Sequence, residues 1–166
     1  RHGRLIFPSI RSISTPALSL IERRSAVAID YASGDPLQTT AHVLYFGMNA
    51  QGRIETGNLE TALFTRHPAA FSAFSRQCRA DRIRAGQIWY WHDAQPALGF
   101  MVLRESPFGA TRLRYVESVL LSLARDYQRD GVTSAAIVLP RSDLEEIKQM
   151  IERWLGKLAL PVTVYE

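Results

Sequence analysis

The side chains best suited to binding chemistry fall where predicted strands end. Asp35 follows a predicted strand over residues 26–31, and Arg104 follows another over residues 97–103. Open α/β sheets bind their ligands at the carboxyl ends of the strands. A carboxylate at that edge can accept a hydrogen bond from an exocyclic amine, and an arginine there can pair with a phosphate. An ordinary Asp-Pro turn and a structural ion pair are the alternatives for these two residues.

A loop that contains two glycines is the third candidate feature. Residues 49–58 lead from a predicted strand over residues 42–46 into a helix, and they include Gly52 and Gly57. Such a loop can direct backbone N–H groups at an anion, and the positive end of the following helix adds to the attraction. Two glycines five residues apart form a weak pattern, so the loop is a candidate anion-binding segment and does not identify a particular ligand.

Several classes of catalysis find no support in the sequence. It contains neither a Gly-x-Ser-x-Gly nucleophile elbow nor the glycine-rich motifs of P-loop and dinucleotide-binding proteins. The four histidines lack the spacing of metal ligands, and Cys78 lies in a predicted amphipathic helix as a small core residue. We therefore assign no catalytic residue and expect no metal and no cofactor.

The strand–helix joint near the C-terminus resembles a nucleotide site without its glycines. An apolar strand over residues 134–139 stops at Pro140, and no glycine occurs from Val132 to Leu155. Many α/β proteins place a glycine-rich phosphate-binding loop at such a joint. The sequence therefore predicts the strand–helix framework here but not the phosphate-binding loop.

The start of the helix after this joint is predicted from its capping residues. Ser142 and Glu145 have the spacing of a capping box, which predicts a helix over residues 142–155. Asp143, Glu145 and Glu146 then lie in the first turn, where each acid stabilises a helix by roughly 0.3–1 kcal/mol. The same charges would repel a diphosphate at this position.

Apolar periodicity and turn signals predict seven strands and five helices. The predicted strands cover residues 5–7, 26–31, 42–46, 87–92, 97–103, 134–139 and 161–165. The predicted helices cover residues 15–24, 58–66, 68–80, 112–129 and 142–155, the fourth closed by Asp130-Gly131. Strands and helices alternate most clearly in the second half, which predicts a three-layer α/β/α sandwich with a mixed, mostly parallel sheet.

Length and composition indicate one globular domain. The 166 residues predict a single domain, with an N-terminal extension over residues 1–25 and a core over residues 26–165. The 46% hydrophobic and 22% charged fractions are ordinary for a soluble protein. No apolar run approaches the ~20 residues that span a bilayer, so we expect no membrane partner.

The charge of the chain is positive, and nearly all of the positive charge is arginine. The formal net charge is +4, and Arg76, Arg79, Arg82 and Arg84 cluster near one predicted helix end. This cluster suggests a nucleic-acid-binding surface, and a solvated basic face is the alternative. Because Cys78 is the only cysteine, a reducing, cytoplasmic location is expected.

Taken in order, these pieces resemble a macrodomain, the ADP-ribose-recognition fold, over most of the chain from residue 26 to 165. The closest likeness is to the branch containing terminal ADP-ribose protein glycohydrolases and the antitoxins that reverse DNA ADP-ribosylation. The motifs behind the resemblance are Ser33-Gly34-Asp35 after a strand, Asn49, Gly52 and Gly57 between a strand and a helix, His67-Pro68 between two helices, Cys78, Ala85-Gly86-Gln87-Ile88 entering a strand, Asp130-Gly131-Val132-Thr133 before a strand ending Leu139-Pro140-Arg141, and the final Val162-Thr163-Val164-Tyr165.

The resemblance implies a set of ligand-binding residues. By position, Asp35 would bind the adenine, and Asn49, Gly52 and Gly57 would belong to the loop around the distal ribose and phosphates. Tyr165 or a neighbour would flank the base. Arg104 falls near the lysine that attacks the sugar in the glycohydrolase branch, and it is the sixth predicted ligand-binding residue.

Four departures from the family pattern argue against its usual enzymatic activity. Pro36 removes the backbone N–H that the family offers to adenine after the aspartate. Glu55 stands where a small glycine is usual. Arginine at position 104 stays protonated and does not readily form the covalent adduct. The second glycine-rich loop, which also carries an acidic catalytic residue in that branch, is absent between Arg141 and Ser142.

Three functional hypotheses follow. The first is a divergent macrodomain-like module that binds ADP-ribose, a related nucleotide or an ADP-ribosylated macromolecule, or that acts as a non-catalytic scaffold for a protein partner. The second is an active ADP-ribosyl hydrolase that uses Asp35 or Glu55. The third is a basic nucleic-acid-binding domain.

Overall fold

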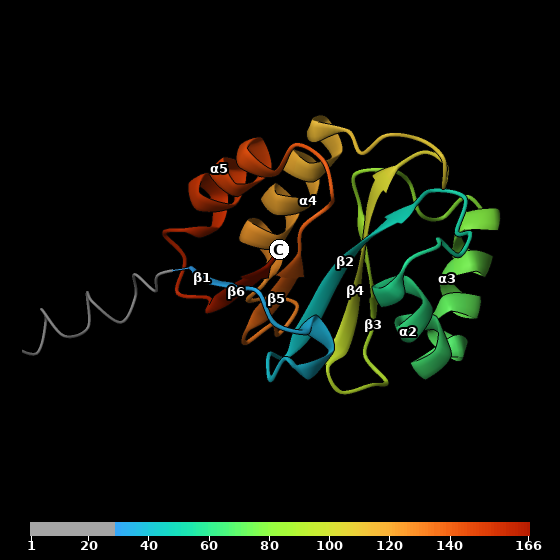
Figure 1. Cartoon of the computed structure of the whole chain (residues 1–166), viewed down its shortest axis with the longest axis horizontal. Helices are drawn as coiled ribbons and strands as arrows, with labels where there is room; N and C mark the ends of the chain where they lie inside the picture. The colour runs from blue at the N-terminus through green and yellow to red at the C-terminus, as the bar shows by residue number, and fades with distance from the viewer. Residues whose placement is uncertain (1–28) are drawn as a thin grey trace, which may run out of the picture.

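Six strands form one sheet with helices on both of its faces (Figure 1). The computed structural model describes residues 29–166. The strands are β1 (Asp30–Ala32), β2 (Val43–Asn49), β3 (Ile88–Trp91), β4 (Ala97–Arg104), β5 (Ala135–Val138) and β6 (Val162–Tyr165). The helices are a 3-10 turn, η1 (Pro36–Gln38), and α2 (Asn58–Arg66), α3 (Pro68–Arg79), α4 (Leu113–Asp126) and α5 (Leu144–Leu155).

The order of the strands is β1-β6-β5-β2-β4-β3, and all neighbours are parallel except β3 and β4. Residues 92–96 join β3 to β4, and so short a connection permits only an antiparallel pair. The predicted α/β/α sandwich with a mixed, mostly parallel sheet is confirmed. The predicted strand over residues 5–7, the helix over 15–24 and the rest of the 1–25 extension lie outside the described residues.

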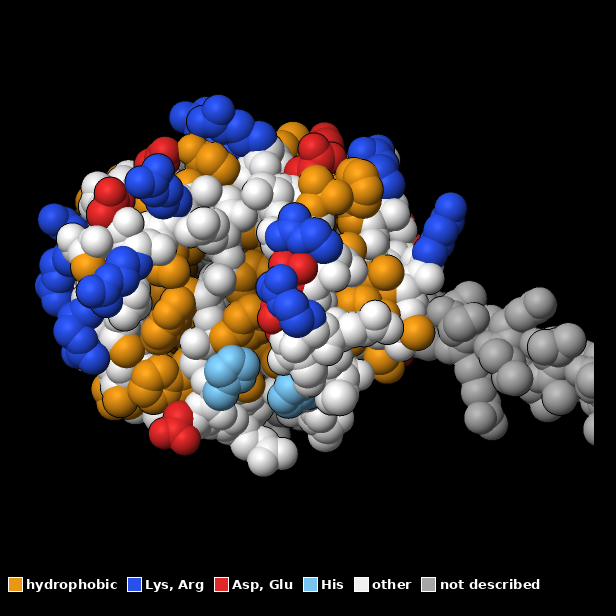
Figure 2. Space-filling view, turned by 180° about the vertical axis from the view of Figure 1, so that it is seen from behind, with side chains coloured by type: hydrophobic (Ala, Val, Ile, Leu, Met, Phe, Trp, Pro, Cys, Tyr) orange, Lys and Arg blue, Asp and Glu red, His pale blue; other side chains and the backbone are white. Residues whose placement is uncertain are grey.

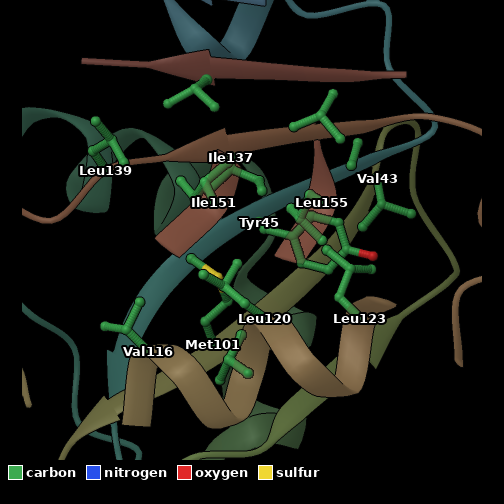
Figure 3. Close-up of a cluster of buried hydrophobic side chains, with 14 of the residues drawn as sticks. Val43, Tyr45, Met101, Val116, Leu120, Leu123, Ile137, Leu139, Ile151 and Leu155 are labelled. Atoms are coloured by element: carbon green, nitrogen blue, oxygen red, sulfur yellow. The ribbon is translucent and has the colours of Figure 1, made fainter. Parts of the chain in front are cut away.

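One face of the sheet is covered by α4 and α5. Along β2, Val43 and Tyr45 point to this face because side chains alternate along a strand. They meet apolar side chains of both helices, and Figure 3 shows the resulting cluster. Its helical members with less than 3% exposure are Val119, Leu120, Leu123, Ile147, Ile151 and Leu155.

The other face is covered by α2 and α3 and is built largely from aromatic rings. Leu44 and Phe46 of β2 point to this face. The Phe100 ring lies 4.6 Å from the Phe74 ring and 5.1 Å from the Phe71 ring, between centroids. Offset and edge-to-face contacts of this kind add to the stabilisation from burial. This cluster fixes α3 against β4.

Several element boundaries differ from the sequence prediction, and three of them bear on the fold. β2 runs three residues beyond the predicted strand and ends at Asn49, because its pairing with β4 continues as far as Arg104. α4 ends at Asp126, and a turn then leads to Gly131, which adopts the predicted left-handed conformation with φ +72°. β1 begins at Asp30, and the first residues predicted for that strand lie outside the described range.

The predicted capping box at the start of α5 is wrong. The helix begins at Leu144, and its N-cap is Asp143, whose carbonyl accepts the first helical hydrogen bond from the Ile147 N–H. Asp143 has φ +56° and ψ +37°, and its side chain makes no capping hydrogen bond. The chain uses Pro140 to Ser142 to cross from β5 to the helix, so the helix starts two residues later than predicted.

Within residues 29–166 no helix is long and apolar enough to cross a membrane.

Candidate functional site

A cleft of about 640 Å³ opens at the carboxyl edge of the parallel strands. The ends of β2, β4 and β5 form its floor, and the β2–α2 loop and the β5–α5 connection form two of its sides. The charged side chains that line it are Glu55, Glu60, Arg104, Arg141 and Glu166. Because parallel strands end at one edge, side chains far apart in sequence meet there.

An ion pair between Glu55 and Arg104 lies in this cleft. Arg104 Nη1 donates to both carboxylate oxygens of Glu55 at 2.7 Å, and Nη2 donates to the Thr111 hydroxyl at 3.1 Å. The two charged side chains are only 14% and 15% exposed. Short hydrogen bonds of this kind in a partly buried place hold the two side chains in a fixed orientation.

Asn49 holds the β2–α2 loop from beneath. It is fully buried, and its side-chain amide donates to the Arg53 carbonyl and to Glu55 Oε2, both at 2.8 Å. Its side-chain oxygen accepts from the Arg53 N–H at 3.2 Å. These bonds turn Glu55 toward the cleft and leave Arg53 exposed on the other side of the loop.

Gly47 makes room for Arg104 within β2. A side chain at this position would come within 3.3 Å of Arg104 Nη2 and 3.2 Å of a Leu103 methyl carbon. The predicted strand stopped at residue 46, so sequence reasoning missed this contribution. A glycine inside a strand indicates a close approach by another group, and that signal was present in the sequence.

The β5–α5 connection brings Arg141 to the start of α2. Its Nη2 lies 3.5 Å from Glu60 Oε1, and the side chain is 78% exposed. A side chain at Gly57 would meet both Glu60 and Arg141, so this glycine permits the contact. Sequence reasoning used Arg141 only to mark the missing loop, and nothing local signals that it faces α2.

Asp35 stands beside the cleft, and its carboxylate is engaged locally. Its Oδ1 accepts the Leu37 N–H at 3.0 Å and so caps the 3-10 turn η1. The side chain is exposed, and Pro36 is the residue of this turn that lines the cleft. The ordinary Asp-Pro turn that the sequence offered as an alternative therefore accounts for this contact.

The remaining predicted residues divide between the cleft and other places. Gly57 is the N-cap of α2 and lies between two cleft-lining residues. Gly52 faces α3, where a side chain would come within 2.8 Å of the Ser75 Cα. Tyr165 is half-buried in the aromatic face of the core, and its neighbour Glu166 lines the cleft. The structure thus pairs Asn49 with Arg104 at the ends of β2 and β4 and sets Gly57 at the edge of the cleft, whereas Gly52 faces α3. The ligand-binding roles stay predictions.

The Cys78 thiol is not an activated nucleophile. Burial raises the pKa of the Cys78 thiol to about 11, so the thiol stays protonated at neutral pH. It packs beneath Gly52 as part of the aromatic face of the core. Residues 29–166 contain no group of three or more His, Cys, Asp or Glu side chains arranged to hold a metal ion.

Comparison with known proteins identifies the fold. No protein-family model matches the sequence, and no curated protein matches it. Among solved structures, the macrodomain of Thermus aquaticus DarG is similar with a TM-score of 0.76 and 23% identity, covering 83% of this chain and 97% of that one. The Mycobacterium tuberculosis DarG macrodomain has a TM-score of 0.74 and 19% identity, covering 84% and 97%. Thermosipho africanus DarTG in complex with ADP-ribose has a TM-score of 0.75 and 17% identity, covering 83% of this chain and 41% of that one.

These similarities define the class of protein first. The chain is an α/β/α sandwich with a cleft at the carboxyl edge of its parallel strands. More specifically, it has the macrodomain fold. The predicted resemblance is therefore confirmed at the level of the fold.

Proposed function

We propose that the cleft binds ADP-ribose or a related adenine nucleotide without hydrolysing it. The observation that carries the proposal is the open cleft of about 640 Å³ with Arg104 inside it and Arg141 at its side. Ligand sites commonly measure 300–1,000 Å³, so the cleft is large enough for a nucleotide. The similar DarTG structure holds ADP-ribose, which supports this choice of ligand.

Arg141 is the proposed phosphate-binding group. Its contact with Glu60 is long and its side chain is 78% exposed, so turning it toward a phosphate sacrifices little. A guanidinium can bind two phosphate oxygens at once. In this proposal a side chain takes over the task that backbone N–H groups perform in a glycine-rich loop. Phe108, which is 97% exposed next to the cleft-lining Gly109, offers an aromatic surface for the base.

The contacts of the acidic residues favour binding over hydrolysis. Glu55 is held by Arg104 and Asn49, and Asp35 accepts the Leu37 N–H. A general base needs a carboxylate that is free to take a proton from water. Glu55 does not meet that condition, and Asp35 caps the η1 turn and lies outside the lining of the cleft, so we expect no release of ADP-ribose from modified protein or nucleic acid.

Titration calorimetry of the full chain with ADP-ribose tests the proposal. The acids near the cleft oppose a diphosphate, so we expect a Kd of roughly 0.1–1 mM, or about −4 to −5.5 kcal/mol. Arg141→Gln should weaken binding about tenfold, which corresponds to roughly 1.4 kcal/mol. Phe108→Ala should weaken binding of AMP but not of ribose 5-phosphate.

The matched control is Arg153→Gln, which removes one positive charge from α5 on the opposite face of the sheet from α2 and α3. It should leave the ADP-ribose affinity unchanged. No heat with millimolar ADP-ribose would overturn nucleotide binding and leave a protein-interaction scaffold as the function of the fold.

A further inference from the structure

A second concave surface lies on the other side of the β2–α2 loop, against α3. Two adjoining hollows of about 500 and 410 Å³ share Arg53, Ser75 and Arg79 in their linings. Arg76 lines the larger hollow, so three arginines face this surface, which we call the arginine groove. No acidic residue lines either hollow.

The three arginines lack ionic partners among the described residues. Within residues 29–166, no ion pair and no hydrogen bond involves the guanidinium group of Arg53, Arg76 or Arg79. Six other arginines each contact an acid, namely Arg84, Arg104, Arg125, Arg129, Arg141 and Arg153. Figure 2 shows Lys and Arg side chains gathered on the side of the molecule where α3 lies. The arginine groove is therefore a concentration of uncompensated positive charge.

The geometry of the groove is fixed before any ligand arrives. Gly52 is buried with φ +70°, and its backbone packs directly against Ser75 of α3. Asn49 holds the backbone of Arg53 through both its N–H and its carbonyl. Because the loop is docked on α3 and held from beneath, Arg53 stays beside the arginines of the helix. Preorganisation of this kind lowers the entropic cost of binding.

One end of the groove is apolar. Ile54 is 50% exposed, and half-buried Phe64 lies against Phe71, with 5.9 Å between ring centroids. Bases of single-stranded nucleic acid pack on such side chains while the backbone follows nearby positive charge. A guanidinium group can bind two oxygens of one phosphate at once.

We propose that the arginine groove binds the phosphodiester backbone of single-stranded nucleic acid, with a base packed against Phe64. Each of the three arginines would contact a phosphate. This site is separate from the nucleotide cleft, because Glu55 and Thr56 of the intervening loop line the cleft while Gly52 to Ile54 line the groove.

Fluorescence anisotropy of the full chain with a labelled 12-nucleotide oligothymidylate tests the proposal. For three phosphate contacts, log K should fall against log salt concentration with a slope of about −2. Replacing Arg53, Arg76 and Arg79 together by Gln should lower the affinity at least tenfold and flatten the slope. Replacing the same three by Lys keeps the charge but removes the guanidinium, and should give an intermediate affinity.

The matched control replaces Arg125, Arg153 and Lys157 by Gln, which removes the same charge from the α4–α5 side of the molecule. Thermal melting checks that both triple variants are folded. Equal losses in the two variants would overturn the proposal, because net charge alone would then explain binding. Full affinity in the groove variant would also overturn the proposal, because binding would then arise outside the groove. Residues 1–28, for example, carry five further arginines.

Two more outcomes bear on the nature of the ligand. No anisotropy change at 50 mM salt would overturn nucleic-acid binding. If polyglutamate competes as strongly as unlabelled oligonucleotide, the ligand of the groove is an acidic peptide and the nucleic-acid proposal is overturned. ADP-ribose titration of the groove variant should match the wild type, so failure of the groove and failure of the nucleotide cleft remain distinguishable.

Discussion

Asn49 connects the two candidate sites at the scale of single residues. Its amide makes three hydrogen bonds that hold Arg53 and Glu55, which face opposite sides of the same loop. A fully buried amide is tolerated there because its N–H groups and its oxygen all have hydrogen-bond partners. The side chain therefore supports both surfaces without being exposed to either ligand.

Asn49→Asp should destabilise the protein by about 2–4 kcal/mol. The change removes the donor to the Arg53 carbonyl and places a carboxylate against Glu55. Urea unfolding of both proteins measures the difference. The matched control is Asn58→Asp at the exposed first position of α2, where an added acid should change stability by less than about 0.5 kcal/mol. A similarly small effect at Asn49 would contradict the proposed support role.

The junction between α2 and α3 contributes a pH-dependent element. His67 ends one helix and precedes the other, and burial followed by the Arg66 charge lowers its pKa from the ordinary 6.5. The unfolded chain therefore binds a proton at a pH where the folded chain does not. Stability from this group is fully present above pH 6.5 and falls as the pH drops toward the lower folded pKa.

His67→Gln should reduce the loss of stability on going from pH 7 to pH 5.5. The measurement is the urea midpoint at several pH values for both proteins. The same substitution at the exposed His92 is the matched control. If both variants change the pH profile equally, the dependence does not arise at the helix junction.

The connection from β5 to α5 is the second element whose geometry is testable. Because Ser142 does not cap α5, Ser142→Ala should change stability by less than about 0.5 kcal/mol, whereas a true capping serine contributes about 1 kcal/mol. Asp143→Val should cost about 1–2 kcal/mol, since a β-branched residue is strained in the left-handed region. Asp143→Gly avoids that strain and is the control. Thermal or urea unfolding of the three variants measures these changes in stability. A large loss of stability in Ser142→Ala would show that Ser142 does cap α5.

At the scale of the whole molecule, the net charge of +4 conceals an uneven distribution. Arginines in and beside the cleft are compensated by Glu55 and Glu60, whereas those of the arginine groove are not. Electrostatic attraction of an anionic polymer depends on this local charge rather than on the net value. The cleft and the groove should therefore respond differently to salt.

The two proposed sites should bind independently. Saturating ADP-ribose should change the affinity for the labelled oligonucleotide by less than about twofold, because the two ligands contact different arginine side chains on opposite sides of the β2–α2 loop. Anisotropy titrations with and without ADP-ribose measure this. Direct competition would show that both ligands occupy one site, and a strong change without competition would show coupling through the loop.

The positions of most elements were predictable because their causes are local. Alternation along residues 42–46 and the helical spacing within residues 112–129 set which side chains face the core, and both elements are present with shifted ends. The end of β2 was missed because pairing with β4, and not its own apolar pattern, extends it to Asn49. The start of α5 was missed because the path of the chain across the sheet edge outweighs the preference of Ser142 for a cap.

The sequence by itself determined the order of strands and helices, the α/β class and the absence of glycines between β5 and α5. These follow from residue types and periodicity over short stretches. Only the tertiary structure decided that Arg104 pairs with Glu55, that Arg141 reaches α2 and that Arg53 joins Arg76 and Arg79. The reason is physical: sheet order and helix docking set the distances between residues far apart in the chain, and those distances decide which charges are neutralised and which remain available to a ligand.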